Sequence, residues 1–158
     1  MIKFTEIRIQ LHIFQEVIHP SHIPLQTKTK SVLLCIPLIH EMARQSGAKT
    51  YFVARKGLKV YLTDPLCVDV NSITTQHEQH LYLSGADAAL MRGKRILIVD
   101  DVISTGESLK ALEKLVEEAG ATVAGRMAVL AEGDAQERSD IVYLEKLPVF
   151  NADGTVKG

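Results

Sequence analysis

The N-terminal part of this 158-residue chain lacks two common residue types, since no glycine occurs before Gly47 and no aspartate before Asp64. Glycine reaches positive φ values and lets the backbone approach a ligand closely. The glycine-rich loops of dinucleotide-binding and Walker-type sites depend on this property, and neither loop occurs in the sequence. The first 46 residues therefore differ in composition from everything after them.

Cysteine is also scarce, and Cys35 and Cys67 do not form a C-x-x-C pair. Both lie between apolar neighbours, so we expect two buried, inert thiols. Two histidine pairs have a spacing that invites a zinc hypothesis, His19-x-x-His22 and His77-x-x-His80. Each pair lacks a second pair of ligands nearby in the sequence, and we do not predict a zinc site from them.

The chain has neither a strong charge imbalance nor a long apolar run. Its formal net charge is −1 and its pI is near 6.6, whereas nucleic-acid binding favours a basic surface. No stretch reaches the roughly 20 apolar residues of a membrane span, and no signal-peptide pattern is present. We expect a cytoplasmic protein that binds neither nucleic acid nor membrane.

The most informative stretch is RILIVDDVISTGES, from Arg95 to Ser108. It contains an apolar strand (Ile96–Val99), two acids (Asp100 and Asp101), a turn with Ser104, Thr105 and Gly106, and a helix from about Ser108. The apolar run is typical of a parallel strand buried on both faces, and ligands bind at the carboxyl ends of such strands. Hydroxyls, a glycine turn and the free N–H groups of a helix together predict a phosphate site.

The acid pair indicates a second part of the same ligand. Asp100 and Asp101 would repel a phosphate, so we expect them to contact sugar hydroxyls or a divalent cation. A phosphorylated ribose with Mg²⁺ satisfies both the acids and the turn. The alternative is a strand end whose acids only cap the following helix.

Hydrophobic periodicity predicts the other elements. Alternation predicts a strand over Ile7–Ile13, and residues 20–30 have the composition of a polar loop. Further strands are predicted at Val32–Ile36, Tyr51–Ala54, Val123–Leu130 and Ile141–Leu144. One helix is predicted with Pro37 in its first turn and Gly47 just past its end, and another stops at Gly120. Because strands and helices alternate, we predict a single α/β domain over residues 1–158, a parallel twisted sheet with flanking helices.

Three basic residues, Arg55, Lys56 and Lys59, follow the strand Tyr51–Ala54. This strand and the acid-bearing strand end at the same edge of the sheet, so the cluster is a candidate pyrophosphate site. The alternative is a solvated loop. Two strand-like runs, Leu66–Thr74 and Gln79–Leu83, then predict a β-hairpin. Its polar residues are candidate substrate contacts or an exposed tip: Ser72, Thr74, Thr75 and Glu78.

The stretch from Arg95 to Ser108 resembles the 5-phosphoribosyl-1-pyrophosphate (PRPP) signature of the type I phosphoribosyltransferases. The similarity extends from about Ile36 to Gly154 and looks closest to bacterial adenine-type purine enzymes. The resemblance implies a Rossmann-like fold and the transfer of phosphoribosyl from PRPP to a purine base. The products would be a nucleoside monophosphate and pyrophosphate, as in nucleotide salvage, and a homodimer is common in the family.

The resemblance also implies roles for particular residues. Asp100 and Asp101 would be catalytic and would hold Mg²⁺. The PRPP contacts would come from Val102, Ile103, Ser104, Thr105, Gly106, Glu107, Ser108, Arg55, Lys56 and Lys59. Related 6-oxopurine enzymes carry a third acid where this chain has Ser104, which favours an adenine-like base. The hairpin resembles the mobile loop that closes over the active site in these enzymes.

The segment 1–35 is atypical of the family, and 36–158 forms the predicted core. The run Ser31–Pro37 contains no glycine, although type I enzymes usually place a glycine-containing pyrophosphate loop there. One interpretation is a divergent hood in which Phe4 or Phe14 stacks on the base. The other is an altered N-terminus in a catalytically impaired or regulatory protein that binds phosphoribosyl ligands.

Overall fold

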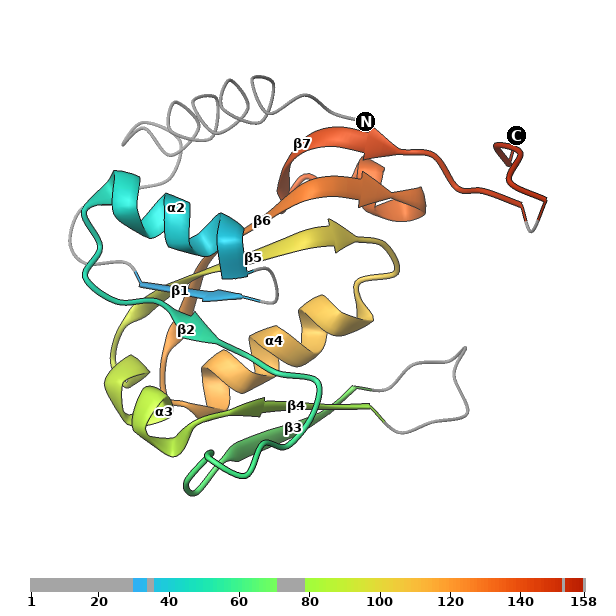
Figure 1. Cartoon of the computed structure of the whole chain (residues 1–158). Coiled ribbons are helices and arrows are strands. Elements are labelled where there is room, and N and C mark those ends of the chain that lie inside the picture. Colours follow the sequence, from blue (N-terminus) through green and yellow to red (C-terminus); the bar gives the residue numbers. More distant parts are fainter. Residues whose placement is uncertain (1–29, 34–35, 71–78, 152, 158) are drawn as a thin grey trace.

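The computed structural model describes residues 30–33, 36–70, 79–151 and 153–157. Figure 1 shows its elements, which are β1 (Lys30–Leu33), α2 (Ile36–Ser46), β2 (Phe52–Val53), β3 (Leu66–Val70), β4 (Gln79–Leu83), α3 (Gly85–Met91), β5 (Arg95–Ile103), α4 (Glu107–Glu118), β6 (Thr122–Glu132), the 3₁₀ helix η1 (Gly133–Glu137) and β7 (Val142–Leu147). Several predictions lie outside the described residues: the strand Ile7–Ile13, Phe4, Phe14, and the hairpin residues Ser72, Thr74, Thr75 and Glu78.

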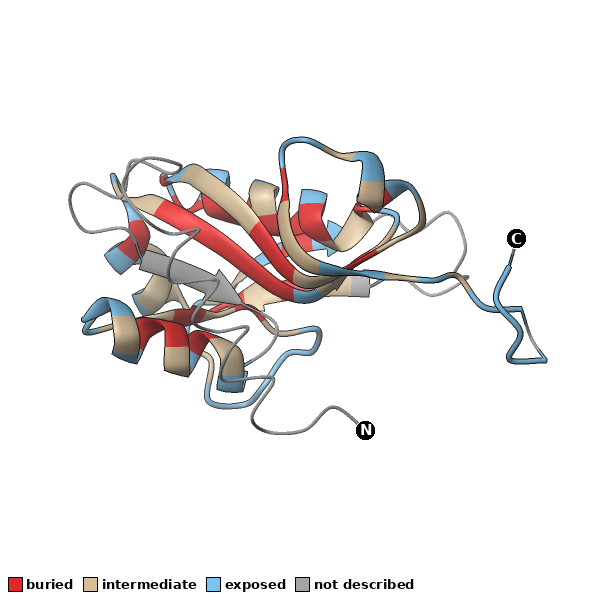
Figure 2. Ribbon diagram, turned by 90° about the horizontal axis from the view of Figure 1, so that it is seen from above, coloured by how far each residue is buried: buried red, intermediate tan, exposed pale blue. Residues whose placement is uncertain are grey.

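Five strands form one parallel sheet in the order β2-β1-β5-β6-β7. The predicted α/β class and the parallel sheet are therefore confirmed. The strand β5 is central, and Figure 2 shows how deeply the middle of the sheet is buried. Residues 96–100 of β5 are all buried, as expected for a strand that is covered on both faces.

Alternate residues of β5 contribute to two separate cores. Ile96 and Ile98 pack in the core that holds Leu112 of α4. Leu97 and Val99 pack in the other core, with Ile39 of α2 and Met127 of β6. The two helices therefore cover opposite faces of the sheet, and β5 leads from the sheet to the α4 side.

The strands β3 and β4 pair antiparallel as a separate two-stranded sheet, which confirms the predicted hairpin. The hairpin contributes Val68, Leu81 and Leu83 to the core under α4. Backbone hydrogen bonds between Arg55 and Tyr82, at 2.9 and 2.8 Å, tie the segment after β2 to this hairpin. The fold thereby brings the predicted basic cluster near the hairpin.

Several boundaries differ from the prediction, and two of them show how strand pairing extends an element. The strand β5 continues to Ile103 rather than ending at Val99, because its pairing with β6 includes Asp100↔Ala128 and Ile103↔Ala131. Near the start of the described residues, Lys30 is not a loop residue as predicted, because it pairs with Ile96 as the first residue of β1. In these two cases strand pairing extends an element beyond its apolar residues, whereas the strand predicted at Val32–Ile36 ends at Leu33 and Ile36 begins α2.

The helix α3 is not predicted from the sequence, and one prediction about cysteine is wrong. Cys67 is exposed rather than buried. In β3, alternate side chains lie on opposite faces, so Cys67 lies on the face opposite to the buried Val68. The apolar neighbours of Cys67 therefore indicated burial for the wrong face of the strand.

Among the described residues, no helix combines the length and the apolar character that crossing a membrane would require.

Candidate functional site

The turn from Ser104 to Gly106 joins the buried strand β5 to the helix α4. Gly106 is the N-cap residue of α4 and has φ +83°, a left-handed conformation that favours glycine. Because glycine has no side chain, the N-cap residue itself cannot occupy the free N–H groups of the helix. Backbone N–H groups in the first turn of α4 therefore remain available to an anion, assisted by the helix dipole.

Arg138 lies against this turn, although it is distant in sequence. A methyl group at position 106 would lie 2.9 Å from Arg138 Nη1, so the glycine leaves room for the guanidinium. Arg138 Nε and Nη2 donate hydrogen bonds to Asp140 at 2.9 and 2.7 Å, which raise the pKa of Arg138. The turn thus has a positively charged neighbour that no local motif indicated, because only the packing of η1 brings it there.

Asp100 is the only polar or charged residue among the described buried residues, with 3% of its surface exposed. Its pKa is raised to about 7, first by burial and then by a side-chain hydrogen bond with Asp101. The backbone N–H of Asp101 donates to Asp100 Oδ1 at 3.0 Å and opposes this rise. The carboxyl of Asp100 therefore exchanges its proton near neutral pH, and a nearby cation would favour the charged form.

Asp101 differs from its neighbour because it is exposed. Its Oδ1 accepts a hydrogen bond from the Val102 backbone N–H at 2.9 Å, which restrains the carboxylate at the strand end. The carboxylate of Asp100 is therefore buried, whereas that of Asp101 is accessible to solvent. Such an all-oxygen donor set fits Mg²⁺, which is bound in proteins by one or two carboxylates together with ligand oxygens.

The structure separates the members of the basic cluster. The positive charge of Lys56 lowers the pKa of Asp100, so Lys56 lies within electrostatic range of the acid pair. The guanidinium of Arg55 instead lies 5.7 Å from the centre of the Tyr61 ring, and its charge acts on Asp87. Lys59 is exposed. Of the three basic residues, Lys56 is the one for which the structure records an interaction with the acid pair.

The acid pair lies where the connections of two adjacent strands diverge. Leu33, the last residue of β1, pairs with Val99, so β1 ends beside the start of the acid pair. The connection after β1 leads to α2 on one face, and the connection after β5 leads to α4 on the other (Figure 1). In open parallel sheets this divergence leaves a crevice at the strand ends, where ligands bind.

These features can be compared with known proteins. The sequence model of a protein family, described as the phosphoribosyl transferase domain, matches residues 35–154. The chain belongs to this family. The match covers the turn, the acid pair and the basic cluster, and the type I fold expected from the resemblance is confirmed.

Proteins with similar sequences share shorter regions with the chain. A hypoxanthine/guanine phosphoribosyltransferase of Methanohalophilus mahii is 30% identical over 103 residues, which cover 65% of this chain and 50% of that protein. One from Methanocella paludicola is 39% identical over 70 residues, 44% of this chain and 35% of that protein. The chain thus spans half or less of the length of these relatives.

Solved structures with the same fold include adenine phosphoribosyltransferases. The enzyme of Rhodothermus marinus has a TM-score of 0.72 at 22% identity, over 89% of this chain and 79% of that one. The enzyme of Saccharomyces cerevisiae has a TM-score of 0.74 at 19% identity, over 90% of this chain and 81% of that one. At these identities the likeness establishes the fold alone, and the two sets of relatives differ in the base that they are named for.

Proposed function

We propose that this chain is a Mg²⁺-dependent phosphoribosyltransferase that transfers the phosphoribosyl group of PRPP to a purine base. The observation that carries the proposal is the arrangement at the end of β5. A buried acid and an exposed acid, Asp100 and Asp101, precede an α4 N-terminus that has a left-handed glycine and no side-chain cap. This arrangement suits a sugar with hydroxyls at one end and a phosphate at the other.

Each part of the site then has a role. The turn Ser104–Ser108 would bind the 5-phosphate through backbone N–H groups and hydroxyls, with the Arg138 guanidinium beside it. Asp100 and Asp101 would hold the ribose hydroxyls and Mg²⁺, and Lys56 would contact the pyrophosphate. When bound, Mg²⁺ would neutralise part of the pyrophosphate charge.

The reaction itself is a substitution at C1 of the ribose. The C1–O bond to pyrophosphate breaks, and its electron pair leaves with the pyrophosphate. A bond forms between C1 and a ring nitrogen of the base, and the proton of that nitrogen passes to water or to the departing pyrophosphate. The protein contributes mainly by positioning and by electrostatic stabilisation of the leaving group.

For the base, we propose an adenine-like purine. Ser104 stands where related 6-oxopurine enzymes have a third acid, and the similar solved structures are adenine enzymes. The curated relatives named for hypoxanthine and guanine support the other purines. A nucleotide-formation assay with adenine, hypoxanthine, guanine and orotate separates these possibilities. Faster turnover of hypoxanthine or guanine than of adenine would overturn the adenine assignment.

The site is tested by the double variant Asp100→Asn/Asp101→Asn. We expect it to lose Mg²⁺-assisted PRPP binding in isothermal titration while it keeps its folded circular dichroism spectrum. Glu117→Gln, an exposed carboxylate change in the last turn of α4, is the matched control and should bind PRPP as the parent does. Unchanged PRPP affinity in the double variant would overturn the proposal.

A second candidate function is binding of PRPP without transfer, in a regulatory role. It is favoured by the short connection between β1 and α2, because β1 ends at Leu33 and α2 begins at Ile36. The two intervening residues are Leu34 and Cys35, so the sequence between these elements contains no glycine of the kind that pyrophosphate loops carry. PRPP binding together with no nucleotide formation from any base would support this function over the first.

A further inference from the structure

One face of the β3–β4 hairpin collects side chains that can bind a metal ion. In the antiparallel register Asp69 pairs with His80, and Cys67 pairs with Tyr82. Because side chains alternate along a strand, Cys67 and Asp69 lie on the same face of β3. The pairing then places His80 beside them, although its sequence position gives no hint of this neighbourhood.

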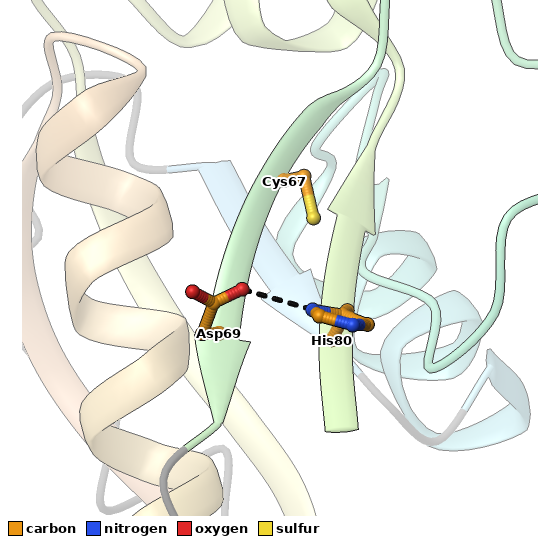
Figure 3. Close-up of side chains that lie close together, drawn as sticks. All are labelled: Cys67, Asp69 and His80. Carbon is orange, nitrogen blue, oxygen red and sulfur yellow. Dashed lines mark hydrogen bonds and ion pairs between the residues drawn. The ribbon is translucent and has the colours of Figure 1, made fainter. Parts of the chain in front are cut away.

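The three side chains converge closely, as Figure 3 shows. His80 Nδ1 and Asp69 Oδ1 lie 2.9 Å apart. The candidate ligand atoms of Cys67, Asp69 and His80 all lie within 4.8 Å of one another. Within the part of the chain that the structure describes, no other three histidine, cysteine or acidic side chains bring their ligand atoms this close together.

We propose that Cys67, Asp69 and His80 form a binding site for a zinc-like divalent ion. A thiolate sulfur, an imidazole nitrogen and a carboxylate oxygen are the three donor types that zinc uses in proteins. Zinc–ligand bonds of roughly 2.0 to 2.3 Å place tetrahedral donors about 3.5 Å apart. The His80–Asp69 separation of 2.9 Å is somewhat shorter than this value, and no pair of candidate donor atoms exceeds 4.8 Å, so small side-chain rotations would complete the site.

The backbone beneath the site is well supported. The opposite face of the hairpin carries Val68, Leu81 and Leu83, which are 2% or less exposed and belong to the main core. The strand frame that carries the ligands is therefore fixed by packing. Such support lowers the entropy cost of ordering the ligands around an ion.

The ligand face is open to solvent. The side chains of His80 and Asp69 are 35% and 73% exposed, and Cys67 is exposed as well. An ion can therefore reach the site from solution, and its fourth coordination position would be filled by water. This pattern of three protein ligands and one open position differs from a closed structural zinc site.

The proposed site is chemically distinct from the acid pair at β5. Asp100 and Asp101 offer oxygen only, which suits Mg²⁺, whereas sulfur and imidazole ligands select softer ions such as Zn²⁺ and Co²⁺. Metal binding on the hairpin is independent of phosphoribosyl transfer at the end of β5. A protein with no transferase activity could still bind zinc on the hairpin.

The test is a titration of the metal-free 158-residue chain with Co²⁺ and then Zn²⁺ in the presence of a phosphine reductant. We expect one equivalent of Co²⁺ to give the near-ultraviolet band of a cobalt–thiolate bond, and Zn²⁺ to remove it by displacement. Cys67→Ser should abolish the band. Asp69→Asn and His80→Gln should each weaken binding by roughly tenfold or more.

Matched variants make the test specific. Cys35→Ser removes the only other thiol, and His40→Gln removes an exposed imidazole on α2. Both should keep the cobalt–thiolate band and the parent affinity. His77→Gln tests the His77-x-x-His80 spacing and should also bind as the parent does. Circular dichroism melting without metal verifies that every variant is folded.

Three outcomes would overturn the proposal. One is the absence of a cobalt–thiolate band in the folded parent chain. Another is loss of the band in Cys35→Ser rather than in Cys67→Ser. The third is equal Zn²⁺ affinity in the parent, Asp69→Asn and His80→Gln, which would assign binding to other residues.

Discussion

The end of β5 and the ligand face of the hairpin both present aspartates, but in opposite environments. Asp100 is 3% exposed and its pKa rises to about 7, whereas the side chain of Asp69 is 73% exposed and pairs with His80 at 2.9 Å. The parallel strand buries its acid between two layers, and the antiparallel hairpin has one face open to water. The environment of a carboxylate, more than its presence in a motif, thus decides its proton and metal chemistry.

The contrast between the buried Asp100 and the exposed Asp69 is tested most strongly by the variant Asp100→Asn. Because the folded-state pKa of Asp100 is raised, the folded protein binds the proton more tightly than the unfolded chain does. Its contribution to stability is therefore present below pH 4 and is lost as the pH rises to about 7. The rise from 3.8 to about 7 corresponds to a cost of up to roughly 4 kcal/mol at pH 8.

We therefore expect Asp100→Asn to be more stable than the parent at pH 8, and this advantage to shrink at pH 5. PRPP binding should be lost at the same time, so stability and function would change in opposite directions. Urea unfolding at the two pH values measures the first effect, and isothermal titration measures the second. Equal stability differences at both pH values would contradict the burial argument.

The second test concerns the turn before α4. Gly106→Ala should destabilise the fold by about 1 to 2 kcal/mol through its left-handed backbone, and it should also displace Arg138 and weaken PRPP binding. Gly47→Ala is the matched control, because Gly47 has φ +68° with nothing within 4 Å of an added methyl group. Gly47→Ala should share the backbone cost but keep PRPP affinity. Equal PRPP affinities in the two variants would separate Arg138 from the site.

A third test divides the basic cluster. Lys56 acts on Asp100, so Lys56→Ala should weaken PRPP by roughly tenfold while weakening the monophosphate product less. Lys59→Ala should have a smaller effect, because Lys56 is the member of the cluster whose charge acts on Asp100. Titration of both variants with PRPP and with a nucleoside monophosphate measures the difference. Equal losses for both ligands would mean that Lys56 contributes only a general positive field.

Elements with a strong local pattern could be predicted from the sequence, whereas an element without one could not. The strand β5, the helix α4 and the hairpin were predictable because hydrophobic periodicity and glycine positions determine them locally. The helix α3 was missed because a short helix of small residues, with Ala86, Ala88 and Ala89, has no clear apolar stripe.

The long-range parts of the two sites were less accessible to prediction. The exposure of Cys67 depends on the alternation of Leu66–Val70, a signal that its apolar neighbours masked. The positions of Arg138 beside Gly106 and of His80 beside Asp69 follow from tertiary packing and strand pairing. No local pattern in the sequence encodes either neighbourhood, although both involve residues that carry charge or bind metals.

The smallest expected effect contrasts the two faces of the hairpin. In the absence of metal, Asp69→Asn should change the free energy of unfolding by about 0.5 kcal/mol or less, because exposed ion pairs contribute little. Val68→Ala, one residue earlier but on the buried face, should cost about 2 kcal/mol through lost packing. Urea unfolding of both variants in a chelator measures the difference. If Asp69→Asn cost as much as Val68→Ala, the ligand face would be part of the folded core, and an open metal site there would be untenable.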